Sequence, residues 1–166
     1  GRSATLLSIS IPEAQALGAV LAALHKAFDH VVDGAQMGSL SLKTELRGCS
    51  VGLIHRDPHA SNILFHAGRV SGIVDFDLVC NGPRMFDFAY LAVSLLADAW
   101  SDSGARERFD SVLVAILRGY ETHTQLRPRE IACIPFLLEE IEEMFIALGR
   151  TTGNRPIDRK STRLNS

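Results

Sequence analysis

The sequence predicts an α+β fold that is mostly helical and carries one small β-hairpin. Apolar residues recur at helical spacing in four separate stretches, which is the main signal for amphipathic helices. Two short apolar runs between residues 63 and 74 are joined by a tight turn containing a glycine, as in a hairpin. The chain has 166 residues, 46% of them hydrophobic, which is enough for one domain with a core.

The first predicted helix covers residues 11–29. Ser10 followed three residues later by Glu13 is a capping-box pattern, and Pro12 suits a first helical turn. The glycine-containing stretch 30–48 is predicted to be loop, with room for one helical turn near 41–47.

The strands are predicted in the middle of the chain. An apolar run over 51–54 forms the first, and the hairpin strands cover 63–65 and 70–74, joined at Ala67-Gly68. The residues Cys80-Asn81-Gly82-Pro83 are predicted to form a turn.

Three more helices are predicted after this turn. They cover residues 84–100, 105–122 and 128–149, and Pro135 predicts a break or kink in the last one. From Thr151 the chain becomes polar and basic without periodicity. We expect a disordered tail over 151–166 and hold open that it is not native coding sequence.

The composition of the chain indicates which partners and which cellular compartment to expect. The net charge is −2, from 17 basic and 19 acidic residues without a basic run, so nucleic acid is not an expected partner. No apolar run reaches membrane-spanning length. The three cysteines are far apart and odd in number, which fits neither a zinc nor a disulfide pattern. Such cysteines suit a reducing compartment, and we predict a cytoplasmic protein.

Polar residues gather at the ends of the predicted strands. His55 and Asp57 follow the first strand, Asn62 precedes the second, and Asp75 and Asp77 end the third. Neighbouring strands can bring Asp57, Asn62 and Asp75 together. Carboxylate and amide oxygens are the ligands that Mg²⁺ bound to substrate phosphates prefers.

The spacing of these residues resembles a known family. The pattern H-x-D-x-x-x-x-N, followed after twelve residues by D-F-D, resembles the kinase catalytic loop and metal motif. The texts HRDPHASNIL, IVDFD and GPRMFDFA are similar to those of the aminoglycoside phosphotransferase superfamily, which includes choline kinases and homoserine-kinase-like enzymes. The resemblance extends over residues 10–150, and its specific part is 52–90.

The resemblance implies the C-terminal lobe of a protein-kinase-like fold, with the metal site on the hairpin. It implies ATP-dependent phosphorylation of a hydroxyl on a small molecule, with ATP and Mg²⁺ as cofactors. The substrate that the resemblance implies is an aminoglycoside, homoserine, choline or another alcohol.

The resemblance also implies roles for individual residues. Asp57 and His55 are the catalytic pair, with Asp57 accepting the proton of the substrate hydroxyl and His55 bracing the loop. Asn62 and Asp75 hold the metals, and Asp77 ranks below them as a further ligand. Asp87, in the D-F-A text, braces the loop through hydrogen bonds.

The sequence departs from the family at several points, including Pro58 for the usual leucine and Ala60-Ser61 for the usual proline and glycine. No glycine-rich loop or strand lysine precedes residue 11, so we expect a kinase fragment, inactive alone, with residues 1–9 as a truncated lead-in. Arg56 replaces the usual glycine, which costs about 1 kcal/mol or more if the backbone there needs a positive φ.

Two other interpretations stay open. His55, Asp57 and His59, with His66 as a fourth ligand, have the composition of a zinc site, as in a metallohydrolase. Alternatively, the chain is a non-catalytic interaction module that self-associates through the face left open by the missing lobe.

Overall fold

The computed structural model describes residues 8–31, 38–40, 46–67, 69–98 and 102–152. The predictions for residues 1–7, for most of the helical turn near 41–47, for Gly68 and for the tail from residue 153 lie outside these ranges. Thr151 and Thr152, predicted as the start of the disordered tail, are instead the last residues of a helix. The four predicted helices are confirmed: α1 (Ile11–Phe28), α2 (Met85–Asp98), α3 (Ser103–Glu121) and α4 (Pro128–Thr152).

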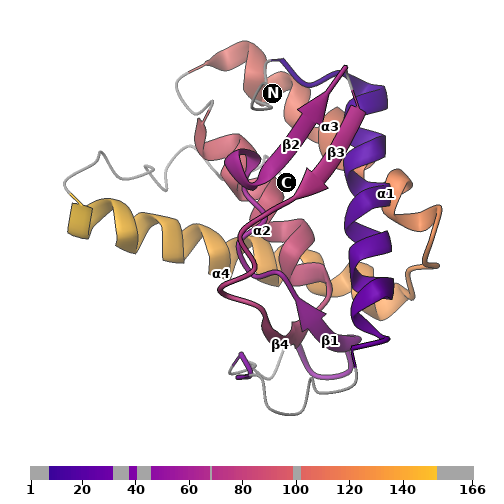
Figure 1. Ribbon diagram of the computed structural model, residues 1–166. Coiled ribbons are helices and arrows are strands. Elements are labelled where there is room, and N and C mark those ends of the chain that lie inside the picture. Colours follow the sequence, from indigo (N-terminus) through magenta and orange to yellow (C-terminus); the bar gives the residue numbers. More distant parts are fainter. Residues whose placement is uncertain (1–7, 32–37, 41–45, 68, 99–101, 153–166) are drawn as a thin grey trace.

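The described strands form two antiparallel pairs. The predicted hairpin is β2 (Ile63–His66) with β3 (Arg69–Ile73), and β1 (Val51–Ile54) pairs with β4 (Cys80–Pro83). A short 3-10 helix, η3 (Ala60–Asn62), connects the segment after β1 to β2. Figure 1 shows the hairpin lying beside α1 and the β1–β4 pair near the opposite end of that helix.

Helix α1 begins with the predicted capping box. The Glu13 carboxylate accepts from the Ser10 backbone N–H at 2.8 Å, and the Ser10 hydroxyl oxygen accepts from the Glu13 N–H at 3.3 Å. These reciprocal bonds satisfy backbone donors that a helix start otherwise leaves unpaired.

Helices α1 and α3 cross at two glycines. A Cβ atom added to Gly18 would lie 1.9 Å from the Ile116 carbonyl oxygen, and one added to Gly119 would lie 1.8 Å from that of Gln15. No side chain fits in such a gap, so the crossing requires glycine at both positions.

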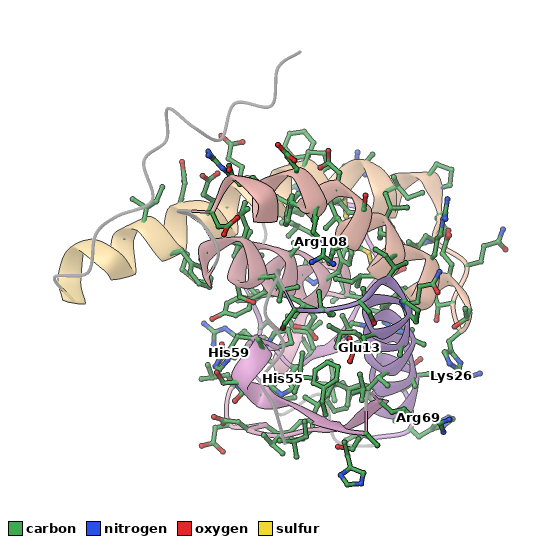
Figure 2. All side chains as sticks on the ribbon, turned by 90° about the horizontal axis from the view of Figure 1, so that it is seen from above. Glu13, Lys26, His55, His59, Arg69 and Arg108 are labelled. Atoms are coloured by element: carbon green, nitrogen blue, oxygen red, sulfur yellow. A yellow bond between two sulfur atoms is a disulfide. The ribbon has the colours of Figure 1, made fainter. Side chains whose placement is uncertain are left out.

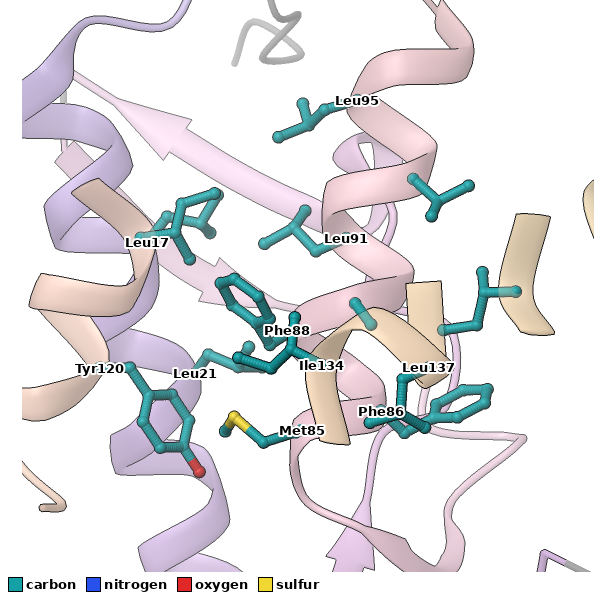
Figure 3. Close-up of a cluster of buried hydrophobic side chains, with 14 of the residues drawn as sticks. Leu17, Leu21, Met85, Phe86, Phe88, Leu91, Leu95, Tyr120, Ile134 and Leu137 are labelled. Atoms are coloured by element: carbon teal, nitrogen blue, oxygen red, sulfur yellow. The ribbon is translucent and has the colours of Figure 1, made fainter. Parts of the chain in front are cut away.

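Helix α2 lies in the centre of the fold, where it packs along α4. Its inward residues meet α1, α3 and α4 in one apolar core. Figure 3 shows buried members of that core, including Leu17, Phe88, Tyr120 and Leu137, converging from the four helices. The core explains why the four periodic stretches fold together.

The prediction of a turn at Cys80–Pro83 was wrong, because these residues form strand β4. Ile54 faces Cys80 and Val51 faces Pro83 across the pair. On its other side, Asn81 donates to the Gly38 carbonyl at 2.8 Å and accepts from the Leu40 N–H at 2.9 Å. Hydrogen bonding on both sides thus makes these residues a strand, although their types favour a turn. Pro83 is the last residue of the strand.

Of the break or kink predicted at Pro135, the break is absent, since α4 is one helix from Pro128 to Thr152 with Pro135 inside it. The kink stays a prediction. A proline in a helix removes one hydrogen bond, to the carbonyl four residues earlier, here Ile131. Ile131 and Pro135 are both exposed, so water can reach the unpaired carbonyl.

The expectation that the cysteines form no disulfide was also wrong. Cys49 and Cys133 are bonded across 84 residues of sequence, and the buried Cys80 is free. Sequence spacing hid the pair because the fold docks the segment before β1 onto the start of α4. There, Arg129 donates to the Arg47 carbonyl from Nε at 3.0 Å and from Nη2 at 2.8 Å.

No helix among the described residues has the length and apolar character that a membrane crossing requires.

Candidate active site

The site is built on the loop from His55 to Asn62, hereafter the 55–62 loop, which links β1 to β2. Asp87, in the first turn of α2, holds the start of this loop from inside the protein. Its carboxylate accepts hydrogen bonds from the backbone N–H groups of His55 and Arg56, both at 2.7 Å. Asp87 is fully buried. A buried carboxylate that accepts two backbone bonds fixes the path of the chain as it leaves β1.

The His55 ring ties the loop to the end of β3. Its Nε2 donates to the Val74 carbonyl at 3.0 Å, and its Nδ1 accepts from the Asp57 N–H at 3.3 Å. The ring is fully buried and lies 4.9 Å from the Phe76 ring, centre to centre. Figure 2 shows His55 inside the molecule and His59 nearer its edge. His55 is therefore a link between Asp57 and the residue that precedes Asp75.

Asn62 makes a second link between the same two segments. Its Nδ2 donates to the Asp57 carbonyl at 3.0 Å, and its backbone carbonyl accepts from the Val74 N–H at 2.9 Å. These bonds leave Oδ1 as the free end of the amide, with no partner among the described residues. The structure thus joins Asp57, Asn62 and the residue before Asp75 through hydrogen bonds.

Asp57 presents its carboxylate at the edge of this cluster, with 21% of the side chain exposed. His59 Nε2 lies 3.5 Å from Asp57 Oδ2, while His59 Nδ1 caps η3 by accepting from the Ser61 N–H at 3.2 Å. From α2, the Tyr90 hydroxyl faces the Asp57 carboxylate. Burial, and then the hydrogen bond to this carboxylate, raise the pKa of Tyr90 above its ordinary value of 10.0. Tyr90 therefore stays protonated at neutral pH and presents a hydroxyl donor to Asp57.

Asp75 and Asp77 lie in the exposed turn after β3. Neither carboxylate has a hydrogen-bond or ion-pair partner among the described residues. Asp75 adopts a left-handed backbone conformation with φ of 68°. Between them, Phe76 packs edge-on against Phe28 of α1, with ring centres 6.3 Å apart, which anchors the turn to the helical body.

Behind Asp87 lies a buried polar chain that the sequence did not reveal. His25 Nε2 is 2.8 Å from Asp87 Oδ2, and His25 Nδ1 is 2.8 Å from the Tyr120 hydroxyl. All three side chains are at most 1% exposed. A lone histidine on an amphipathic helix is more often a packing residue than a functional one, and His25 is buried. No local signal pointed to Tyr120 or Tyr90, because both lie in stretches whose periodicity indicates only core.

Arg56 occupies the strained position that the sequence suggested. Its φ is 73°, in the left-handed region where a residue with a Cβ costs about 1–2 kcal/mol. The side chain is exposed, so the strain is set by the backbone path between His55 and Asp57.

The histidine cluster considered for zinc does not assemble. The described residues contain no group of three or more His, Cys, Asp or Glu side chains that can hold a metal ion. Both ring nitrogens of His55 are engaged in hydrogen bonds, and His66 is exposed at the far end of β2.

A helical body that carries an H-x-D-x-x-x-x-N loop and a D-F-D turn on a small hairpin defines the class as a protein-kinase-like fold. The comparison with solved structures confirms it. The chain matches the amicoumacin kinase hAmiN, solved in complex with AMP-PNP, Ca²⁺ and Ami, with a TM-score of 0.73 at 19% identity. The match covers 100% of this chain and 57% of that one.

The chain belongs to the APH phosphotransferase enzyme family, whose model matches residues 13–130. Curated relatives include a homoserine kinase of Methylorubrum populi, 37% identical over 86 residues, which is 52% of this chain and 25% of that protein. Another is a homoserine kinase of Neisseria meningitidis serogroup B, 31% identical over 84 residues, or 51% and 26% of the two chains. The matched stretch spans about a quarter of the length of these relatives.

These findings confirm the predicted superfamily and fold, and they place the chain in a phosphotransferase enzyme family. The catalytic and metal-binding roles of individual site residues stay predictions.

Proposed function

We propose that the chain carries the catalytic loop of an ATP-dependent phosphotransferase that phosphorylates a hydroxyl group on a small molecule. The observation that carries this proposal is the hydrogen-bonded link from Asp57 through Asn62 to Val74. It sets a base candidate, an amide oxygen and the Asp75 turn beside one another, which is the set of groups that phosphoryl transfer uses. The names of the relatives support an alcohol as the acceptor, since several are homoserine kinases.

The donor set suits a hard divalent cation such as Mg²⁺. Asn62 Oδ1 and the Asp75 carboxylate are oxygen donors without partners among the described residues, and Mg²⁺ commonly takes one or two carboxylates together with substrate phosphates. Asp77 offers a further carboxylate in the same turn. When bound, the cation would neutralise charge on the phosphates of ATP. The neighbour hAmiN was solved with a nucleotide analogue and Ca²⁺, which supports a nucleotide and a divalent cation here.

The work of the remaining residues follows from their contacts. Asp57 would orient the substrate hydroxyl and accept its proton, since its carboxylate is partly exposed and its backbone is fixed on both sides. His55 would hold the loop against β3, because both of its ring nitrogens are already engaged. Asp87 would fix the start of the loop through its two backbone bonds.

Activity of the whole protein tests the proposal. We expect Asp57→Asn to lower kcat by about 10²–10⁴-fold, the usual contribution of a general base. Asp75→Asn should abolish the Mg²⁺ dependence of nucleotide binding. The matched control is His66→Gln, an exposed change on the hairpin away from the Asp57 carboxylate. Undiminished phosphoryl transfer in Asp57→Asn would remove the base assignment.

A second candidate function is favoured by one specific observation. Four large apolar side chains around the hairpin and the D-F-D turn are 39–46% exposed: Leu64, Val74, Phe76 and Leu78. We propose as the alternative that this face makes the chain a self-associating interaction module. Concentration-dependent sedimentation, compared between the unmodified chain and Leu64→Ser/Leu78→Ser, decides it: a monomer at every concentration rules out self-association.

A further inference from the structure

Tyr120 is a buried tyrosine whose hydroxyl has a single partner among the described residues. It projects from α3 into the core among side chains of α1 and α2 (Figure 3), and it is 1% exposed. Its hydroxyl lies 2.8 Å from His25 Nδ1, and no other group of the described residues bonds to it. A buried hydroxyl left without an acceptor costs about 1–3 kcal/mol. The O–H of Tyr120 therefore donates to His25 Nδ1.

This bond decides where the His25 ring carries its proton. With Nδ1 accepting from Tyr120, the proton of the neutral ring sits on Nε2, where it donates to Asp87 Oδ2 at 2.8 Å. The opposite tautomer would set an N–H against the tyrosine hydroxyl and a lone pair against the carboxylate, leaving two buried groups unpaired. Burial raises the pKa of Tyr120, which keeps its hydroxyl a donor.

Asp87 connects the His25 ring to the backbone of the 55–62 loop. Its Oδ2 accepts from both His25 Nε2 and the His55 N–H, while its Oδ1 accepts from the Arg56 N–H. The carboxylate is thus held by one side chain and holds two backbone groups. If the His25 ring turns, Asp87 loses the contact that fixes its orientation toward the loop.

The glycine crossing explains how Tyr120 reaches His25. Gly119 precedes Tyr120 and allows α3 to approach the Gln15 carbonyl, while a Cβ on Gly18 would lie 2.8 Å from the Tyr120 nitrogen. His25 is seven residues after Gly18, two helical turns along the same face of α1. The closest approach of the two helices therefore leads directly to the Tyr120–His25 bond.

We propose that Tyr120 is a positioning residue for the 55–62 loop, acting through His25 and Asp87. The proposal rests on the proposed function only in treating this loop as the catalytic one. The chain of contacts runs from α3 through α1 and α2 to the backbone of residues 55 and 56, so three helices must be assembled before the loop is fixed.

Hydrogen exchange in the full chain tests the proposal. In Tyr120→Phe, we expect exchange of the His55 and Arg56 amides to accelerate about tenfold relative to the β1 amides, the factor equivalent to about 1.4 kcal/mol. The matched control is Ser94→Ala, which removes another buried hydroxyl, one that donates to the Leu91 carbonyl within α2. Equal acceleration of these two amides in both variants, or none in Tyr120→Phe, would overturn the proposal.

A measurement on the unmodified chain keeps the proposal testable if Tyr120→Phe does not fold. Nitrogen-15 shifts of the His25 ring should report a protonated Nε2 and an unprotonated, hydrogen-bonded Nδ1; the reverse tautomer contradicts the proposal. In the whole protein, Tyr120→Phe should lower kcat several-fold with little change in KM for the hydroxyl substrate. If no alcohol is phosphorylated at all, the proposed function fails, while the exchange and ring-nitrogen results still decide the role of Tyr120.

Discussion

The two sides of the 55–62 loop are held in opposite ways. On the inner side, Asp87, His25 and Tyr120 are buried, and each polar atom that faces the loop has a hydrogen-bond partner. On the outer side, Asp75 and Asp77 are exposed carboxylates without partners among the described residues. Buried polar groups are costly unless paired, so the inner set is part of what folds the chain. The outer set makes no such bonds among the described residues, so its proposed role is to bind a ligand and not to hold the fold.

The largest expected effect comes from removing the centre of the inner set. Asp87→Ala leaves two backbone donors and His25 without their acceptor, and breaking a buried polar pair of this kind costs about 3–5 kcal/mol. Urea denaturation measures the loss as a lower midpoint. The matched control on the outer side, Asp77→Ala, should stay within about 0.5 kcal/mol. Equal losses would erase the distinction between the two sides.

The next largest loss of stability is expected from breaking the disulfide, which holds the segment before β1. Cys49 and Cys133 close a loop of 84 residues, and such a crosslink contributes about 2–4 kcal/mol, mainly by restricting the unfolded chain. A thiol reductant should lower the free energy of unfolding by that amount. The double variant Cys49→Ser/Cys133→Ser should be equally destabilised and insensitive to the reductant. If the reductant leaves the unmodified chain unchanged, the bond is absent in solution.

A smaller loss of folding stability is expected from a substitution where α1 and α3 cross. In Gly119→Ala, the new methyl group would meet the Gln15 carbonyl oxygen at 1.8 Å, so the helices must separate at a cost of about 1–3 kcal/mol. Thermal unfolding measures it. The control is Gly104→Ala, in the first turn of α3, where the nearest atom is the Asp102 side-chain oxygen at 3.3 Å. An alanine there should be neutral or slightly stabilising. If both alanine variants unfold alike, the crossing is looser than the structure shows.

The sequence predicted the outer side better than the inner side. The residues at the strand ends, Asp57, Asn62 and Asp75, belong to a local motif whose spacing is readable along the chain. The hairpin and the helices were predicted for the same reason, because periodicity is a local property.

The inner side depends on contacts between distant segments, which no local pattern encodes. His25 meets a tyrosine 95 residues away and an aspartate 62 residues away. The Cys49–Cys133 bond and the pairing of β4 with β1 also join distant segments. The cysteine spacing suggested no disulfide, and the residue types of β4 suggested a turn. Asp87 was identified only through the family resemblance, since a first-turn aspartate is ordinary on a helix.

The smallest expected change in stability comes from relieving the backbone strain at Arg56 in the 55–62 loop. Arg56 has φ of 73°, and glycine tolerates this conformation without the steric cost of a Cβ. Arg56→Gly should therefore raise the free energy of unfolding by about 1 kcal/mol. Ala67→Gly is the matched control, because Ala67 has φ of 49° in the hairpin turn, away from Asp57, and should gain a similar amount. If Arg56→Gly lowers stability while Ala67→Gly raises it, the Arg56 side chain itself stabilises the folded loop. Arg56 would then belong with the structural residues of the inner side and not with the ligand-facing outer side.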